Sequence, residues 1–239
     1  MNPLRTLADL VYPRTCADCG RPARGVGDGA LCADCQMRVR VVQLPFCSIC
    51  GDPVAGEVPG KYVCAWCRKN GPAFSWARSA VRYAGPVRPC IRNLKYHAGF
   101  WALPEIARWL EALWPTCPEG AGGADAIVPV PLHLTRRWER TYNQASLVAG
   151  VLSKIAGIPV RRGWLWRVRK TGTQTHLTAA QRARNVQGVF AVPFKRFVAG
   201  RKIILVDDVM TTGATLNECA KALRKAGAAD VMAITVARG

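Results

Sequence analysis

Two kinds of hydrophobic pattern alternate along residues 71–239 of this chain. Short apolar or alternating runs are typical of β-strands, and apolar residues that recur every three or four positions are typical of amphipathic helices. Because strands alternate with helices, the pattern predicts a parallel α/β sheet flanked by helices. The predicted strands cover residues 74–83, 125–130, 163–168, 203–206 and 231–236. The predicted helices cover 86–94, 101–114, a stretch after a basic loop that ends near 156, and a stretch from Leu216 to a cap at Gly227.

The segment from Lys202 to Thr215 concentrates the features of a ligand site. Its apolar run, 203–206, predicts a strand buried on both faces and ends at two carboxylates, Asp207 and Asp208. Ligands of open α/β sheets bind beyond the carboxyl ends of the strands, where a helix N-terminus offers backbone N–H groups and a positive dipole end to a phosphate. The carboxylates would repel that phosphate, so we expect them to bind sugar hydroxyls or hydrated Mg²⁺. The turn between the carboxylates and the helix consists of small residues and includes Thr211, Thr212, Gly213, Ala214 and Thr215.

Three ligand sites compete as interpretations of this segment, beside a strand that simply ends in solvated aspartates. A P-loop nucleotidase needs a G-x-x-x-x-G-K-[ST] loop, which the chain lacks. A response regulator needs its acidic pair near the start of the domain, whereas this pair lies near the end. The remaining interpretation is a site for the 5-phosphate and ribose hydroxyls of phosphoribosyl pyrophosphate (PRPP). The segment resembles the PRPP motif of type I phosphoribosyltransferases.

Eight of the eleven cysteines form four C-x-x-C pairs within the first 67 residues. Two such pairs supply four thiolates for a tetrahedral Cys₄ site, so eight ligands predict two structural Zn²⁺. Redox C-x-x-C motifs come singly beside a βαβ pattern and are not favoured. We expect the first pair to combine with the second and the third with the fourth, and a cross-brace of alternating pairs is the alternative. The predicted ligands are Cys16, Cys19, Cys32, Cys35, Cys47, Cys50, Cys64 and Cys67.

The change from cysteine-rich to alternating α/β sequence predicts two domains. Residues 1–70 would form a double zinc ribbon and residues 71–239 the α/β domain. Gly20 and Gly51 follow C-x-x-C pairs, as in zinc knuckles that need a left-handed residue there.

The net charge of +19 is unevenly distributed. There are 13 Lys and Arg residues between Glu139 and Asp207 and no acidic residue. Such a field attracts polyanions such as nucleic acid, an anionic membrane or multiply phosphorylated ligands, and a generally basic surface is the plain alternative. Because two Cys₄ zinc sites each carry a formal charge of −2, we expect the ribbons to serve folding or docking rather than DNA contact.

No apolar run approaches the length of a membrane span, and the N-terminus lacks the apolar core of a signal peptide. The sequence therefore predicts a cytoplasmic protein. The basic charge also suits a peripheral position at the inner face of the membrane.

A set of short motifs connects the chain to a known family. They are P-V-P-L-H from Pro129, R-x-Y-N-Q from Arg140, T-x-x-Q-x-x-L from Thr171, R-x-x-N-V-x-G-x-F from Arg182 and L-V-D-D-V-M-T-T-G-A-T from Leu205. Behind a cysteine-rich N-terminal region, this set resembles the ComF family of competence proteins, which includes ComFC and the GntX-like proteins. The chain departs from the family pattern at Thr141, where Gly is usual, and at Tyr142, where Phe is usual.

The resemblance implies a double zinc ribbon before a type I phosphoribosyltransferase domain, and it implies roles for individual residues. Asp207 and Asp208 would hold the ribose hydroxyls of PRPP, directly or through Mg²⁺. The turn Thr211–Thr215 would wrap the 5-phosphate, and Pro131 and Leu132 would begin the pyrophosphate loop. An arm over residues 170–185 would close over PRPP, with Arg182 and Arg184 as charge donors.

Two classes of function follow from these expectations. The resemblance implies a competence protein that binds PRPP with Mg²⁺ and single-stranded DNA, with a helicase or another uptake protein as a further candidate partner. The alternative is an enzyme that transfers phosphoribose from PRPP to an unidentified acceptor. Four aromatic residues within the basic stretch could stack on bases: Tyr142, Trp164, Trp166 and Phe190. For Trp164, Trp166 and Phe190, packing in the core is the alternative.

Overall fold

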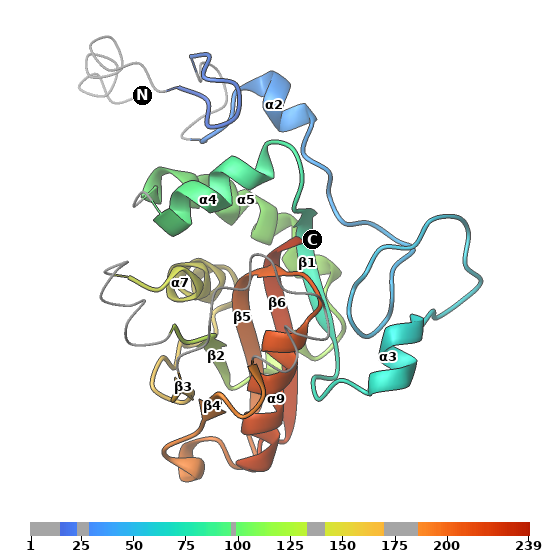
Figure 1. Ribbon diagram of the computed structural model, residues 1–239, viewed down its shortest axis with the longest axis vertical. Coiled ribbons are helices and arrows are strands. Elements are labelled where there is room, and N and C mark those ends of the chain that lie inside the picture. Colours follow the sequence, from blue (N-terminus) through green and yellow to red (C-terminus); the bar gives the residue numbers. More distant parts are fainter. Residues whose placement is uncertain (1–14, 23–28, 97–98, 133–141, 170–185) are drawn as a thin grey trace.

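A four-stranded parallel sheet forms the centre of the molecule (Figure 1). The computed structural model describes residues 15–22, 29–96, 99–132, 142–169 and 186–239. The strand order is β1-β6-β5-β2, and every neighbouring pair runs parallel, as the sequence pattern predicts. The strands are β1 (Ala77–Arg82), β2 (Ala126–Pro129), β5 (Lys202–Met210) and β6 (Asp230–Arg238).

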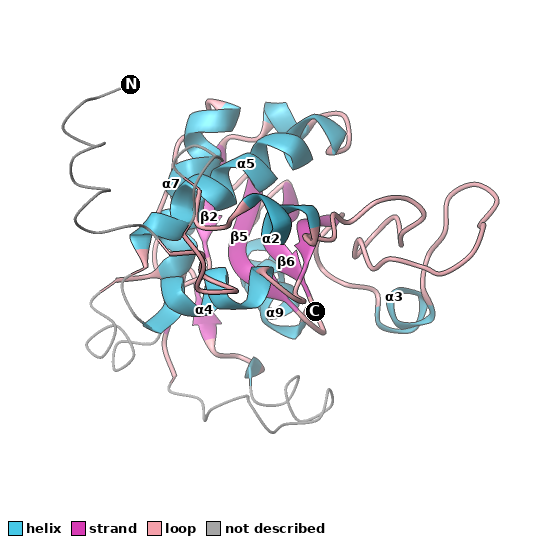
Figure 2. Ribbon diagram, turned by 90° about the horizontal axis from the view of Figure 1, so that it is seen from above, coloured by secondary structure: helices cyan, strands magenta, loops and turns pink. Residues whose placement is uncertain are grey.

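Helices cover both faces of this sheet, which explains why its strands are apolar on both sides. α5 (Leu103–Leu113) and α7 (Gln144–Ala156) pack on one face and α9 (Ala214–Lys225) on the other (Figures 1 and 2). Ile204 and Val206 of β5 belong to the core under α5 and α7, whereas Ile203 and Leu205 belong to the core under α9. The predicted inward residues of α9 are all buried: Leu216, Cys219, Ala220 and Leu223.

α4 (Val87–Tyr96) lies next to α5, above the carboxyl ends of the strands in the view of Figure 1. Val87, Cys90, Ile91 and Leu94 form its buried side. This spacing of three and four residues is the inward stripe of an amphipathic helix. Three short 3₁₀ turns flank α5 along the chain: η1 (Phe100–Ala102) precedes it, and η2 (Trp114–Thr116) and η3 (Ala121–Gly123) lie between it and β2.

Two strand predictions are wrong. The strand expected over 163–168 is reduced to β3 (Trp166–Arg167), which pairs antiparallel with β4 (Phe190–Ala191) in a separate two-stranded sheet. Val160 instead forms a parallel bridge to Ile127 of β2. β5 does not end at Val206, because β6 is long enough to pair with it as far as Met210. A last 3₁₀ turn, η4 (Lys195–Phe197), precedes β5.

The cysteine-rich region forms two small units with one short helix each, α2 (Ala33–Met37) and α3 (Ala65–Asn70). The first unit lies beyond α4, and the second lies to the side of β1 (Figures 1 and 2). The chain between them runs antiparallel to β1, with a bridge between Val41 and Val81. In the parts of the chain that the structure describes, no helix is long and apolar enough to cross a membrane.

Candidate functional site

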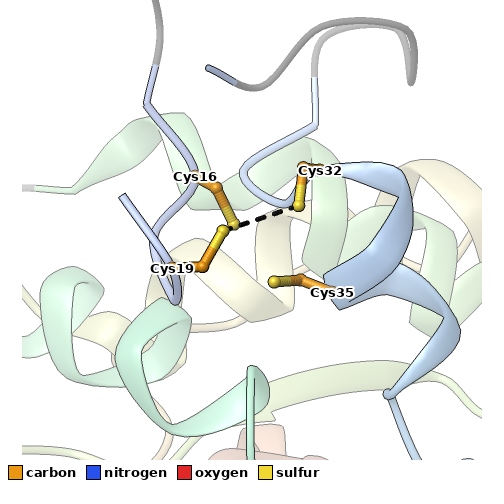
Figure 3. A group of neighbouring side chains, drawn as sticks. All are labelled: Cys16, Cys19, Cys32 and Cys35. Atoms are coloured by element: carbon orange, nitrogen blue, oxygen red, sulfur yellow. Dashed lines mark hydrogen bonds between the residues drawn. The ribbon is translucent and has the colours of Figure 1, made fainter. Parts of the chain in front are cut away.

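The cysteines converge in two groups of four, and the pairing is sequential as predicted. Cys16, Cys19, Cys32 and Cys35 form the first cluster, and their sulfur atoms point toward one another in Figure 3. Cys47, Cys50, Cys64 and Cys67 form the second cluster. Within each cluster all Sγ atoms lie within 4.8 Å of one another.

These spacings fit zinc. Tetrahedral Zn–S bonds of about 2.3 Å place the sulfur atoms about 3.8 Å apart. The Sγ atoms of Cys19 and Cys32 are 3.7 Å apart, and those of Cys50 and Cys64 are 3.8 Å apart. All four thiolates would hold a structural ion, which leaves no open position for catalysis.

Backbone N–H groups stabilise one thiolate in each cluster. Burial raises the pKa of Cys16, but hydrogen bonds from the N–H groups of Cys19 and Cys32 outweigh it and lower the pKa to about 6. The same balance lowers the pKa of Cys47 to about 7, through the N–H groups of Cys64 and Cys50. Each cluster therefore presents a thiolate near neutral pH, the form that binds metal.

An arginine lies against each cluster and opposes its negative charge. In the first, Arg38 donates to the Sγ of Cys35 at 3.0 Å and pairs with Asp18. In the second, the buried Arg78 donates to the carbonyl of Ser48 at 3.1 Å and stacks 4.6 Å from the centre of the Phe46 ring. The formal −2 charge of a Cys₄ zinc site makes these positions favourable for a cation.

A second site lies at the carboxyl end of β5. Because successive side chains of a strand point to opposite faces, Asp207 and Asp208 face different layers of the molecule. Asp208, which is 7% exposed, faces α4. Asp207 faces α9, where its carboxylate and burial together raise the pKa of Cys219.

Lys95 of α4 is the counter-ion of this acidic pair. Its Nζ lies 2.9 Å from the Oδ2 of Asp208, and both side chains are mostly buried. Burial lowers the pKa of Lys95, but attraction to Asp208 outweighs it and leaves the pKa raised. Burial and the neighbouring Asp208 raise the pKa of Asp207 to about 7. The pair therefore shares one cation, and Asp207 accepts a proton near neutral pH.

The turn after β5 leads directly into α9. Gly213 caps that helix with a φ of 75°, a left-handed conformation that favours glycine, and the first helical N–H, that of Ala214, donates to the hydroxyl of Thr212 at 3.4 Å. A Cβ at Gly213 would lie 2.7 Å from the Cε of Met210. The first backbone N–H groups of α9 therefore face the same end of the sheet as the acidic pair, an arrangement suited to a phosphate.

The start of α7 holds Lys95 in place. Asn143 caps α7 by accepting from the N–H of Ala145 at 3.0 Å, and its amide donates to the carbonyl of Val130. Tyr142 donates its hydroxyl to the carbonyl of Leu94, and Gln144 donates to the carbonyl of Lys95 at 3.2 Å. The last three residues of the motif R-x-Y-N-Q, Tyr142 to Gln144, thus join the ends of β2, α4 and α7 near the acidic pair.

Arg238 of β6 connects this end of the sheet to the second cysteine cluster. Its guanidinium donates to the carbonyls of Met210 and Thr211 at the start of the turn. It also pairs with Asp52, two residues after Cys50, at 3.1 Å. Arg238 is buried and Asp52 is 43% exposed, so this bridge between two distant parts of the chain runs from the interior to the surface.

Comparisons with known proteins identify a family for each of the two parts of the chain. The double zinc ribbon domain family matches residues 7–70, and the phosphoribosyl transferase domain family matches residues 148–239. Competence protein F of Haemophilus influenzae is 33% identical over 218 residues, covering 89% of this chain and 92% of that protein. The chain belongs to the ComF family.

Two further ComF relatives are similar over most of their length. DNA utilization protein YhgH of Escherichia coli K12 is 32% identical over 225 residues, covering 93% of this chain and 96% of that protein. Competence protein ComFC of Bacillus subtilis 168 is 24% identical over 223 residues, covering 88% of this chain and 85% of that protein.

The structure of this ComF protein adds residues that sequence reasoning missed. Lys95 continues the inward stripe of α4 four residues after Ile91, and that position is the signal that could have found it. Arg238 and Asp52 gave no such signal, because they are far apart in the sequence. Of the predicted residues, Asp207, Asp208 and the turn 211–215 lie together, whereas Arg182 and Arg184 lie outside the described residues.

The aromatic residues of the basic stretch divide into two groups. Phe190 is buried and packs in the core, so of its two predicted roles core packing holds and base stacking does not. Tyr142 is half-buried with its hydroxyl bonded to α4, and Trp164 is half-buried against the core under α9. Trp166 is 51% exposed.

Proposed function

We propose that this protein binds PRPP together with Mg²⁺ at the carboxyl end of β5 and supports the uptake and handling of DNA in the cytoplasm. One observation carries the first part: a mostly buried acidic pair with its own lysine lies beside a helix N-terminus that begins at Gly213. Anionic phosphate and vicinal hydroxyls are the groups that such a combination binds.

The residues divide the ligand between them. The N–H groups and hydroxyls of the turn Thr211–Thr215 receive the 5-phosphate, and Asp207 and Asp208 receive the ribose hydroxyls or water around Mg²⁺. Bound Mg²⁺ would neutralise charge on the pyrophosphate. Lys95 then has to share Asp208 or leave it, and an ammonium group released at this position can contact the pyrophosphate of the ligand instead.

A thermal-shift experiment tests this assignment. PRPP with Mg²⁺ should raise the melting temperature, because a ligand that binds only the folded state stabilises it. Asp208→Asn should abolish most of the shift, whereas the matched control Asp125→Asn should keep it, since Asp125 pairs with Arg201 at the opposite end of the sheet. A full shift in the folded Asp208→Asn variant would place the ligand elsewhere.

The DNA-related part rests on relatives and on charge. Relatives are named as competence and DNA utilization proteins, and the acid-free basic stretch suits a polyanion. The proposed partners are single-stranded DNA and a protein of the uptake machinery such as a helicase. Disruption of the gene should lower the transformation frequency of the host strain. Wild-type protein should restore it, and restoration by an empty vector would contradict the role.

A phosphoribosyl transfer to an acceptor is the second candidate. The rings of Phe100 and Tyr142 lie 5.0 Å apart beside the end of α4, and Phe100 is 46% exposed. They offer an aromatic surface next to Lys95 for a planar acceptor. In that reaction the acceptor attacks the ribose C1 atom and pyrophosphate leaves with the electrons of the broken C–O bond. Pyrophosphate release with one member of a panel of bases would favour this candidate, and release with none would favour binding alone.

A further inference from the structure

Three aromatic side chains are exposed together near the end of the sheet that lies away from the acidic pair. Phe194 is 53% exposed, Phe197 45% and Trp166 51%. The rings of Phe194 and Phe197 lie 6.1 Å apart, edge to face. Trp166 pairs across the two-stranded sheet with Ala191, three residues before Phe194. In Figure 1, β3, β4 and the turn below them occupy one corner of the molecule.

This corner is a folded structure and not a loose loop. The N–H of Phe197 donates to the carbonyl of Phe194 at 3.2 Å, and the N–H of Val198 donates to that of Lys195 at 2.9 Å. Val198 is completely buried and anchors the turn to the core under α9. The fold therefore holds large apolar rings in water at fixed positions, which marks a surface that binds a partner.

The charge around these rings is positive and uncompensated. Lys195 and Arg196 are exposed between the two phenylalanines, and Arg196 lies 4.9 Å from the centre of the Phe197 ring. Arg161, Arg162 and Arg169 are exposed on the segments that lead into and out of β3. None of these five cations forms an ion pair with any residue that the structure describes.

A ligand bound at this corner would leave the acidic pair accessible to a second ligand. η4 precedes the first residue of β5, whereas Asp207 and Asp208 lie near its last residue, Met210. At about 3.3 Å per residue, the first residue of β5 lies about 17 Å from Asp207 and about 25 Å from the turn after Met210. A ligand on this corner and a phosphate ligand at the turn after β5 therefore do not compete for the same residues.

We propose that Trp166, Phe194, Lys195, Arg196 and Phe197, here called the η4 surface, form the contact for single-stranded DNA. The inference rests on the DNA-binding part of the proposed function and specifies its location. Exposed rings can stack on unpaired bases while the flanking cations contact the phosphates, a combination typical of single-strand binding without sequence preference. The zinc ribbons and the PRPP site are not part of this contact.

Fluorescence anisotropy of a labelled oligo(dT) with the full-length, zinc-loaded protein tests the location. Phe194→Ala with Phe197→Ala should weaken binding at least tenfold, because each stacked ring contributes to binding. Lys195→Gln with Arg196→Gln should reduce the slope of log affinity against log salt by about 1.4, since each phosphate contact to a single strand accounts for about 0.7. The second variant changes only exposed side chains, so it remains informative if the first variant does not fold.

α3 provides a matched control with the same chemistry on the second ribbon. There, Trp66 is 37% exposed and lies beside the exposed Arg68 and Lys69. Trp66→Ala with Arg68→Gln and Lys69→Gln should leave oligo(dT) binding unchanged. If this control loses binding and the η4 variants keep it, the contact lies on the ribbon and the inference is overturned. Displacement of oligo(dT) by PRPP with Mg²⁺ would also overturn it, because the two sites would then overlap.

The wild-type measurement separates this inference from the proposed function. If wild-type protein binds oligo(dT) and every η4 variant binds equally well, the location is wrong and DNA binding stands. If wild-type protein fails to bind at low salt, the DNA-binding part itself is wrong, and the inference fails with it. Photocrosslinking of a 5-iodouracil oligonucleotide should label the peptide that contains Phe194 and Phe197, and labelling of the Trp66 peptide alone would contradict the proposal.

Discussion

The two cysteine clusters have the same ligands and nearly the same spacing, yet they contact the rest of the molecule in different ways. The first shares a hydrophobic core with α4, in which Cys16 and Cys35 lie among apolar residues such as Ile91. The second also lies in a hydrophobic core, the one under α9, and it is in addition joined to the sheet by directional bonds. The N–H of Ala77 donates to the carbonyl of Ile49 at 2.6 Å, and Asp52 pairs with Arg238.

This difference determines what each cluster can influence. Apolar contacts are non-directional, so small shifts of the first cluster leave the sheet unchanged. Hydrogen bonds fix the second cluster in register with β1, and Arg238 extends that connection to the turn at Thr211. We therefore expect changes in the second cluster to reach the phosphate-binding turn, and changes in the first to remain local.

Removal of one zinc site at a time should produce the largest effect. Cys16→Ser with Cys19→Ser, and Cys47→Ser with Cys50→Ser, should each leave one Zn²⁺ per chain by elemental analysis. Structural zinc contributes about 10–16 kcal/mol in isolated fingers, so either ribbon should unfold without its ion. Only the second pair of substitutions should also abolish the melting shift with PRPP and Mg²⁺. The reverse pattern would contradict the comparison.

The two knuckle glycines provide a smaller and better matched test. Gly20 has a φ of 72° and Gly51 a φ of 66°, and both follow a C-x-x-C pair. A Cβ at Gly20 would meet nothing within 4 Å, whereas a Cβ at Gly51 would lie 2.6 Å from the carbonyl oxygen of Ala77. Gly20→Ala should cost about 1–2 kcal/mol from backbone strain. Gly51→Ala should cost about 1–3 kcal/mol more from overpacking, measured by chemical denaturation. Equal losses would show that the contact with β1 is not tight.

Arg238, which pairs with Asp52 next to the second cluster, and Arg38, which lies against the first cluster, should differ in their effect on PRPP binding. Arg238→Gln removes a charged donor from two carbonyls of the turn, so PRPP affinity should fall about tenfold. Arg38→Gln removes an exposed ion pair with Asp18 and should change stability only slightly, with PRPP affinity unchanged. Isothermal titration calorimetry of both variants checks this. A larger loss of affinity in Arg38→Gln would place the connection at the first cluster.

The titration of Asp207 should give the smallest effect. Its pKa is raised to about 7 in the folded protein, so between about pH 4 and 7 the folded state holds a proton that the unfolded state has lost. Its contribution to stability is therefore present below about pH 4 and is lost as the pH rises to 7. Asp207→Asn should flatten this part of the stability curve relative to wild type. Substitution of Asp52 should slightly shift the pH midpoint of this loss of stability, and substitution of Asp18 should leave that midpoint unchanged.

Local patterns predicted the site where the chain itself brings residues together. The order strand, acidic pair, small turn and helix places Asp207, Asp208 and Gly213 at one end of β5 without any distant contact. The sequential cysteine pairing was expected but not determined by the sequence, because similar distances separate successive C-x-x-C pairs and a cross-brace was the alternative; in the structure each cluster closes over a short loop, which costs the least entropy.

Contacts between distant segments could not be predicted in this way. The ion pair of Lys95 with Asp208 depends on how α4 packs above the sheet, and the pair of Arg238 with Asp52 depends on where the second ribbon docks. The strand error over 163–168 has a related cause. Leu165 is buried and Trp166 is exposed, an alternation that is identical for a strand of the main sheet and for the two-residue strand β3.

The chain between the two clusters has a consequence for the solubility of the sheet. β1 is an edge strand, and the chain between the clusters covers its free edge with backbone hydrogen bonds. The N–H of Val42 donates to the carbonyl of Ala80 at 3.0 Å, and the N–H of Arg82 donates to the carbonyl of Arg40 at 2.7 Å. Exposed edge strands pair with other chains and aggregate. A truncated protein that starts after residue 70 would present this edge to solvent, so we expect it to form inclusion bodies even though every residue of the acidic pair and its turn is retained.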